Sequence, residues 1–361
     1  MISPPRLAAF AAFVLLAGFT STRAESLILV AGTGHSPDGS AAVLGSLDAP
    51  FGVDFDHEGS MYIVEMVGHR VRKVDRKGVL TTFAGTGRKG DHGDGGPALD
   101  AEFNGMHSLV VSPGNTIYIT DTWNNRVRKI DPATGRISAF AGTGEKGFDG
   151  DGGPALNAQF GGVYCIALDP LGKHMYLADL DNHRIRAVDL GTGLVETIAG
   201  NGKRGLPDDG ANAKESPLVD PRAVAADGEG NVYIVERSGH AVRVVGPDGK
   251  IHTIIGTGKA GASLGDGDPL SVQLNGPKYI SINQRNGDVF IADTENHRVL
   301  KYLPKDRKVV LVAGTGKKGS KGLGGPPTEA ELSQPHGVHV GPDGPLYISD
   351  SSNNRVLKIV P

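Results

Sequence analysis

A motif that recurs at a nearly constant spacing restricts the fold of this chain more than any other feature. An acidic residue, a short turn and a basic, β-branched run recur six times, and successive acids are 56 to 58 residues apart. The six acids are Glu65, Asp121, Asp179, Glu236, Asp293 and Asp350. A second motif, AGTG or a near copy, also occurs six times, beginning at Ala31, Ala84, Ala141, Ala199, Ile255 and Ala313. The chain therefore consists of six repeated units.

Within each unit the residues alternate with a period of two, which is typical of β-strands. The first unit reads GVDFD, HEGS, MYIVE, MVG, HRVRKVD, RKG and VLTTFAGTG, so strands alternate with polar turns. Four short antiparallel strands in a meander, here named a to d, form a propeller blade. The sequence predicts an all-β fold, a six-bladed β-propeller of four-stranded antiparallel blades. The 54 glycines, about twice the ~7% average, suit the many tight turns.

The strand pattern predicts that the two ends of the chain share one blade. SLILVAGTG near the N-terminus has the form of a d strand with no a, b or c strand before it. NNRVLKIVP at the C-terminus ends after a c strand. Pairing these two strands would close the ring and leave no open sheet edge there. We therefore predict one propeller domain over residues 25–361, closed by its N-terminal strand.

The first 24 residues form a separate segment. Arg6 precedes an apolar run over residues 7–19, and the sequence TRA at 22–24 has the form of a cleavage site. The run is too short to span a bilayer, so we expect a signal peptide cleaved after Ala24 and export to the periplasm or the extracellular space. We expect no membrane span elsewhere. The formal net charge of −3 offers no basic face for nucleic acid.

The repeats resemble those of the NHL-repeat family of six-bladed propellers, whose blades carry a D-x-x-N-x-R-(V/I) signature. The best copies are DTWNNRV, DLDNHRI, DTENHRV and DSSNNRV, and the fourth unit departs most, with Ala241 in place of the arginine. The resemblance covers the chain from residue 25 onward and implies the fold. It does not imply one function, because such propellers include lyases, lactonases and binding modules.

Features that all units share are expected to serve the fold. A carboxylate before a turn accepts backbone N–H groups and can pair with the arginine five residues later, so we interpret the six acids as structural. The Asp-rich loops at 91–96 and 148–153 raise the alternative of calcium binding. The sequence FDGDGG lacks the further spaced oxygens and terminal Glu of a calcium loop, so we interpret these loops as turns.

Residues that differ between units at one equivalent position are better functional candidates. The a strands begin PFGVDF, MHSLVV, VYCIAL, PRAVAA, PKYISI and PHGVHV. Because a strands line the channel of a propeller, their second residues should form a ring at its mouth. This predicted mouth ring consists of Phe51, His107, Tyr164, Arg222, Lys278 and His336. Trp123, in a b–c turn on the same face, is a further candidate contact for a ligand or partner.

The first functional hypothesis is a non-catalytic propeller that binds a protein, a peptide or an anionic small molecule at this face. Arg222 would bind a carboxylate or phosphate, Lys278 would add charge, and Tyr164 and the two histidines would orient the ligand. Arg222 and Lys278 would also repel each other. Either Glu236 and Asp293 or a bound anion must offset that repulsion.

The second hypothesis is a metal-dependent lyase or hydrolase. MHSL at His107 and PHGV at His336 are similar to the PHSL-type strand openings that supply zinc-binding histidines in peptidyl-amidoglycolate lyases. That resemblance implies zinc at both histidines, but Arg222 occupies the third position of the set and cannot bind a metal. Asp121 or Asp350 would have to supply the third ligand that zinc requires. The alternative resemblance to lactonase propellers lacks recognisable channel ligands.

Overall fold

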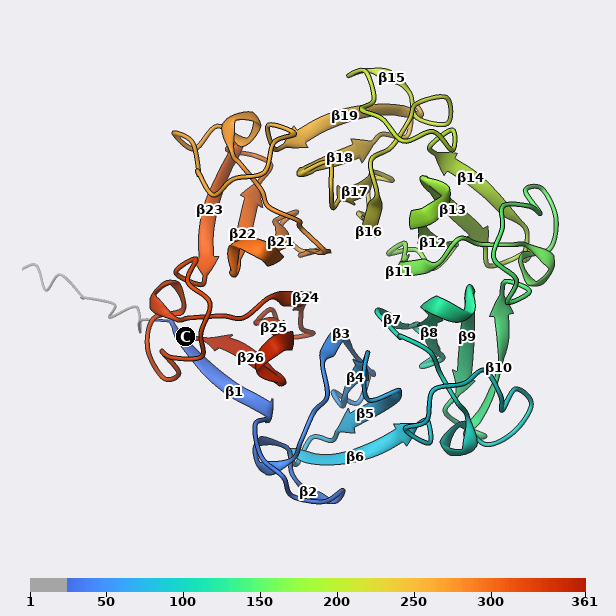
Figure 1. Cartoon of the computed structure of the whole chain (residues 1–361), viewed down its shortest axis with the longest axis vertical. Coiled ribbons are helices and arrows are strands. Elements are labelled where there is room, and N and C mark those ends of the chain that lie inside the picture. Colours follow the sequence, from blue (N-terminus) through green and yellow to red (C-terminus); the bar gives the residue numbers. More distant parts are fainter. Residues whose placement is uncertain (1–24) are drawn as a thin grey trace, which may run out of the picture.

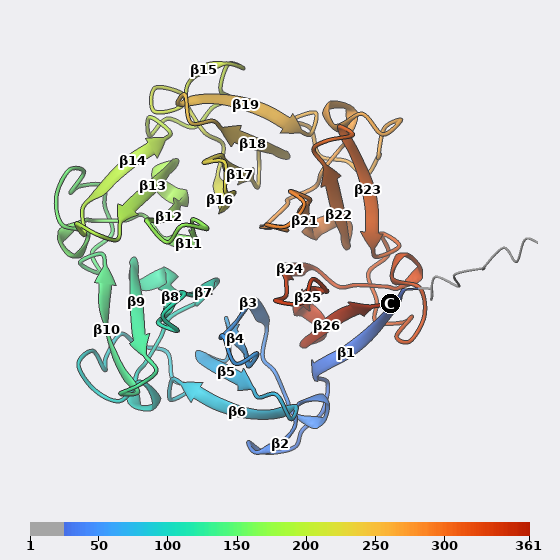
Figure 2. The ribbon, with the colours of Figure 1, turned by 180° about the vertical axis from the view of Figure 1, so that it is seen from behind.

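The computed structural model describes residues 25–361, and the predicted signal peptide lies outside the described residues. Six antiparallel sheets surround a central axis (Figure 1), and the reverse view shows the same closed ring (Figure 2). The predicted six-bladed β-propeller is confirmed. No helix in this part of the chain has the length and apolar character needed to cross a membrane.

The two inner strands of each blade come from the predicted a and b segments. The a strands are β3 (Pro50–Phe55), β7 (Leu109–Val111), β11 (Val163–Leu168), β16 (Pro221–Ala226), β20 (Tyr279–Ile282) and β24 (Pro335–Val340). The b strands are β4 (Met61–Glu65), β8 (Ile117–Asp121), β12 (His174–Asp179), β17 (Val232–Glu236), β21 (Val289–Asp293) and β25 (Leu346–Asp350). Each b strand ends on its signature acid, which places all six acids at one face.

The two outer strands follow in the same order in every blade. The c strands are β5 (Arg70–Val74), β9 (Arg126–Asp131), β13 (Arg184–Asp189), β18 (Ala241–Val245), β22 (Arg298–Leu303) and β26 (Arg355–Val360). The d strands are β6 (Val79–Ala84), β10 (Arg136–Ala141), β14 (Val195–Ala199), β19 (Lys250–Ile255), β23 (Lys308–Ala313) and β1 (Ser26–Gly32). The c strands are buried over most of their length, whereas the d strands are buried mainly near their two ends, as at Leu80 and Ala84 of β6.

The ring closes within a sheet. β1 pairs antiparallel with β26, and the register runs from Ser26 opposite Val360 to Gly32 opposite Arg355. Leu27 of β1 is fully buried in the hydrophobic core. The predicted closure of the last blade by the N-terminal strand is therefore confirmed.

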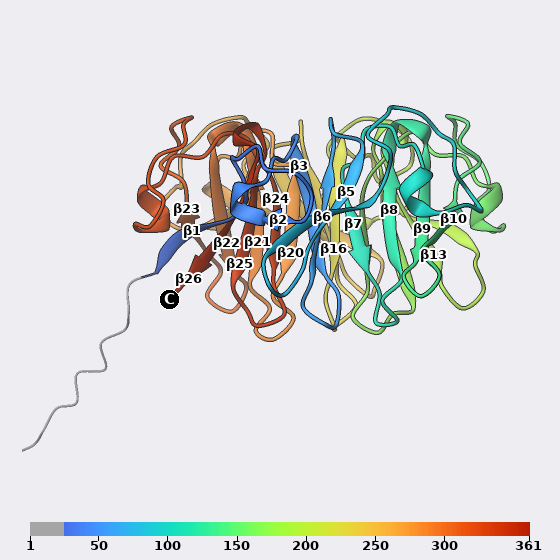
Figure 3. The same ribbon diagram turned by 90° about the horizontal axis from the view of Figure 1, so that it is seen from below.

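Two kinds of connection occupy one face of the disc, and short hairpin turns project from the other (Figure 3). The d–a connections contain the 3₁₀ turns η1 (Ala42–Leu44), η2 (Ala98–Asp100), η4 (Ala155–Asn157), η6 (Pro269–Ser271) and η8 (Pro327–Glu329). The b–c connections contain η3 (Thr122–Asn124), η5 (Leu180–Asn182), η7 (Thr294–Asn296) and η9 (Ser351–Asn353). Two blades gain a fifth, two-residue strand that was not predicted, β2 (Ser40–Ala41) or β15 (Ala211–Asn212), because the d–a connection that leads into the blade pairs with that blade's own strand d.

The signature acids hold the connections together, as predicted. All six are fully buried. Asp121, for example, accepts the backbone N–H of Asn104 at 2.8 Å, the Asn124 amide at 2.9 Å and Arg126 Nε at 3.3 Å. For Asp179 the predicted pairing with the arginine five residues later, Arg184, is wrong. Its guanidinium partner is Arg186, at 3.6 Å. These contacts fix the face on which the mouth ring lies.

Candidate functional site

The six residues of the mouth ring come together around the axis. Phe51 stacks on His336 with ring centroids 4.1 Å apart and meets His107 edge-on at 5.0 Å. His107 lies 4.7 Å from Tyr164, measured between ring centroids. The Arg222 guanidinium lies 4.5 Å from the centre of the Tyr164 ring. Lys278 Nζ is 3.2 Å from His336 Nε2, so contacts link all six side chains.

Two of these residues precede their strand, although the sequence predicts them within it. β7 begins at Leu109 and β20 at Tyr279, so His107 and Lys278 lie just before them. In blade 2 the Thr120 hydroxyl accepts the backbone N–H of His107 at 3.2 Å. The backbone N–H of His107 therefore bonds to a side chain instead of a backbone carbonyl of the neighbouring strand. For this reason β7 begins only at Leu109.

Arg222 is a buried cation without a carboxylate partner in residues 25–361. It is 4% exposed, and its Nη1 reaches only the backbone oxygen of Tyr164 at 3.5 Å. Burial lowers the pKa of Arg222 to about 10. The prediction that Glu236 neutralises this blade is wrong, because Arg243 Nε lies 2.7 Å from Glu236 Oε2. Glu236 pairs with Arg243 because blade 4 has Ala241 at the position of the signature arginine.

Lys278 is neutralised, but not by the predicted carboxylate. Asp293 bonds to Arg298 Nε at 2.7 Å, whereas Lys278 Nζ donates to Glu295 Oε1 at 2.7 Å. Burial lowers the pKa of Lys278, and the hydrogen bond that Lys278 donates to Glu295 opposes that effect. Sequence reasoning missed Glu295. It occupies the same place in its b–c turn as Trp123, a position that also varies between units.

The two histidines are oriented alike by backbone carbonyls. His107 Nδ1 lies 2.6 Å from the carbonyl oxygen of Gly105, and His336 Nδ1 lies 2.8 Å from that of Gln334. A carbonyl only accepts, so each Nδ1 carries the proton and each Nε2 carries a lone pair. Burial lowers the pKa of both imidazoles far below its usual value, and the charges of Arg222 and Lys278 lower the pKa further.

These residues do not fit a zinc site. No three His, Cys, Asp or Glu side chains within residues 25–361 are grouped so as to hold a metal ion. Asp350, proposed as a third ligand, is buried and bonded to Arg355 Nε at 2.7 Å. Lys278 Nζ also sits against His336 Nε2, the atom that a metal would need.

The Asp-rich loops contact arginines rather than one another. Arg128 Nη2 lies 2.9 Å from Asp94 Oδ1, and Arg186 Nη2 lies 2.8 Å from Asp151 Oδ1. Both arginines are fully buried. These aspartates therefore compensate buried charges of the fold, which agrees with the structural interpretation of the two loops.

Trp123 lies at the edge of the mouth ring. Its side chain is 46% exposed, and its ring centroid is 5.7 Å from that of His107. Gly105, with φ of +64°, passes under the indole, and a Cβ there would meet it at 2.3 Å.

Cys165 lies next to Tyr164 on β11 and is buried, and burial raises the pKa of its thiol.

Comparison with known families agrees with this architecture. The family model described as "Teneurin NHL domain" matches residues 191–315, and the one described as "NHL repeat" matches residues 103–130 and 332–359. The chain is an NHL-repeat β-propeller. This NHL propeller is 26% identical over 284 residues to "Protein SUPPRESSOR OF QUENCHING 1, chloroplastic" of Arabidopsis thaliana, covering 76% of the chain and 26% of the plant protein.

A second relative is "NHL repeat-containing protein 2" of Bos taurus, 24% identical over 339 residues, covering 85% of the chain. The NHL propeller spans 46% of the bovine protein, so both relatives are much longer than the matched part. Among solved structures, an auxiliary nutrient binding protein from Bacteroides thetaiotaomicron superposes with a TM-score of 0.68 at 16% identity. The match covers 93% of this chain and 76% of that one, and it shows a shared fold.

Proposed function

We propose that this NHL propeller binds an anionic group, a carboxylate or phosphate carried by a small molecule or peptide, at the mouth ring. The observation that carries the proposal is the unpaired Arg222. A buried charge without a partner is strongly unfavourable, whereas a guanidinium forms paired hydrogen bonds with a carboxylate or phosphate. An anion at the ring would supply the partner that residues 25–361 do not provide.

The neighbours of Arg222 suit the rest of such a ligand. Lys278 adds a second cation, held in place by Glu295. Neutral His107, with a lone pair on Nε2, can accept a hydrogen bond from a hydroxyl or amide group of the ligand, whereas His336 Nε2 already faces Lys278 Nζ. Phe51 and Tyr164 offer aromatic contacts within the ring, and Trp123 offers one at its rim. The ring thus combines one anion position with several positions for uncharged groups.

We propose a binding role rather than catalysis, because the residues of the ring do not fit the metal that the lyase hypothesis requires. The fold neighbour described as an auxiliary nutrient binding protein agrees with binding. We also propose that the ligand is met outside the cytoplasm, on the basis of the predicted signal peptide. Sequencing the N-terminus of the exported protein tests that location, with Glu25 expected as the first residue.

Titration calorimetry of small carboxylates and of inorganic phosphate tests the binding proposal. Arg222→Met keeps an unbranched apolar side chain and removes the guanidinium charge. It should weaken anion binding at least tenfold. The matched control is Lys305→Gln, which removes one positive charge from an exposed position in a c–d turn on the opposite face. The proposal is wrong if Arg222→Met and the wild type respond equally to the same anions.

A further inference from the structure

The central channel is divided below the mouth ring. Tyr279, from blade 5, reaches across the axis, and its Oη lies 3.1 Å from Ser108 Oγ in blade 2. A Cβ on Gly52 in blade 1 would lie 3.2 Å from the same Oη, so glycine leaves room for the phenol. The Tyr279 side chain therefore forms a partition across the channel.

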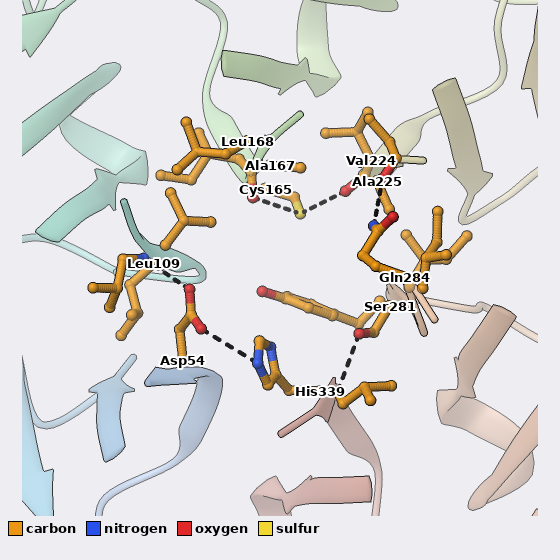
Figure 4. A pocket seen from close by; sticks show the side chains of 18 residues that line it. Asp54, Leu109, Cys165, Ala167, Leu168, Val224, Ala225, Ser281, Gln284 and His339 are labelled. Atoms are coloured by element: carbon orange, nitrogen blue, oxygen red, sulfur yellow. Dashed lines mark hydrogen bonds and ion pairs between the residues drawn. The ribbon is translucent and has the colours of Figure 1, made fainter. Parts of the chain in front are cut away.

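A second set of channel residues lies beyond the partition. The residues three positions after the mouth ring form what we call the inner ring: Asp54, Val110, Ala167, Ala225, Ser281 and His339. All six line a cavity of about 240 Å³ (Figure 4). Its lining ends at Gln284, just after β20, so the cavity lies toward the a–b turns, at the opposite end from the mouth ring. Like the mouth ring, the inner ring differs between units.

Most of the residues that line this cavity are aliphatic, and none of them is lysine or arginine. Its acidic group is Asp54, whose Oδ2 accepts the backbone N–H of Val111 at 2.7 Å. Oδ1 accepts the N–H of Phe55 at 2.7 Å and lies 3.3 Å from His339 Nε2. A carboxylate has about four acceptor positions, so these three partners leave one for a ligand. Burial raises the pKa of Asp54, and His339 opposes that effect.

We propose that this cavity binds a small primary amine on an apolar body of about one aromatic ring, with the ammonium group on Asp54. An apolar cavity of about 150 Å³ accommodates benzene, so 240 Å³ accommodates a ring with a short side chain but no peptide. Ammonium groups carry only donors, which matches the free acceptor position of the carboxylate. The proposal does not depend on anion binding, since it concerns the opposite end of the channel and a ligand of opposite charge.

Benzylamine is the probe, with benzyl alcohol and benzoate as neutral and anionic compounds of nearly the same shape. In calorimetry at pH 7.5, benzylamine should bind the wild type at least tenfold more tightly than benzyl alcohol, and benzoate should not displace it. Asp54→Asn should weaken benzylamine binding at least tenfold. Asp343→Asn, at an exposed position in an a–b turn, is the matched control and should bind as the wild type does.

Ala225→Phe is a second variant that leaves Asp54 and its backbone partners intact. It places an aromatic ring in the cavity and should abolish benzylamine binding, while any response to anions at the mouth ring is unchanged. The proposal is overturned if benzylamine does not bind at 10 mM, on the order of the weakest affinity expected for so small a ligand. It is also overturned if benzyl alcohol binds equally well, or if Ala225→Phe binds benzylamine as the wild type does.

Discussion

Replacing the buried Arg222 by methionine should make the protein more stable. Burial lowers the pKa of Arg222 to about 10 on folding, which corresponds to about 3 kcal/mol of unfavourable charge burial. Losing the contact with Tyr164 offsets about 1 kcal/mol of that gain. The net increase in the free energy of unfolding is about 2 kcal/mol. With an unfolding entropy of roughly 2.1 cal/mol/K per residue, this raises the Tm by about 3 °C.

The same difference in pKa determines how the stability effect of Arg222 depends on pH. The folded state has the lower pKa, so the unfolded chain binds the proton more tightly. The destabilisation by Arg222 is therefore complete at every pH below about 10 and disappears only as the pH rises above about 10 toward the higher pKa of the unfolded chain. The stability gain of the variant should be the same at pH 6 and pH 8.

Arg243→Met is the matched control, because Arg243 is equally buried, at 5% exposure, in the same sheet. Its removal leaves the buried carboxylate of Glu236 unpaired, which costs about 3–5 kcal/mol and lowers the Tm by about 4–7 °C. Differential scanning calorimetry of the two variants should therefore give shifts of opposite sign. If Arg222→Met lowers the Tm as Arg243→Met does, our account of the unpaired charge is refuted.

Three further predictions concern closure, protonation and metal. Leu27→Ala, in the closing strand β1, should lower the free energy of unfolding by about 3–5 kcal/mol in urea denaturation. Ile28 on the same strand is 37% exposed, so Ile28→Ala should lower it by less than about 1 kcal/mol. Equal effects of the two variants would contradict closure by β1. NMR titration should show that His107 and His336 stay neutral at pH values where an ordinary histidine is protonated. Stability should fall as the pH drops below about 6.5, because the unfolded chain then takes up protons that the folded histidines do not; ordinary histidine titration would contradict the burial argument. Treatment with EDTA should leave the Tm unchanged, and stoichiometric zinc in the untreated protein would restore the lyase hypothesis.

The sequence determined the architecture well because each unit repeats the same local signals. Strands with a period of two, turns at fixed offsets and a constant spacing leave few alternatives to a propeller. Closure followed from the missing d strand of the last unit. The mouth ring also followed, because side chains at equivalent positions of six a strands must surround one axis.

The partners of the ring residues could not be read from the sequence. Signature acids were expected to neutralise Arg222 and Lys278, but Glu236 and Asp293 already bind the arginines of strand c. Which of two carboxylates meets Lys278 depends on side-chain reach across a turn, which repeat spacing does not specify. The inner ring was not predicted, because only the second residue of each a strand was compared between units. Asp54 and His339 lie three residues after the mouth-ring residues Phe51 and His336 and differ between units in the same way.

The pairing of β1 with β26 has a consequence for how the molecule is made. Ser26 has no strand partner until Val360 has been synthesised, so the first strand to emerge is the last to find its place. Contacts between residues this distant in sequence form slowly. Until then both edges of the incomplete ring can pair with other chains. A circular permutant that joins β26 to β1 by a short c–d turn and is opened in a d–a connection would make every blade contiguous in sequence, and it should refold faster and aggregate less than the natural order.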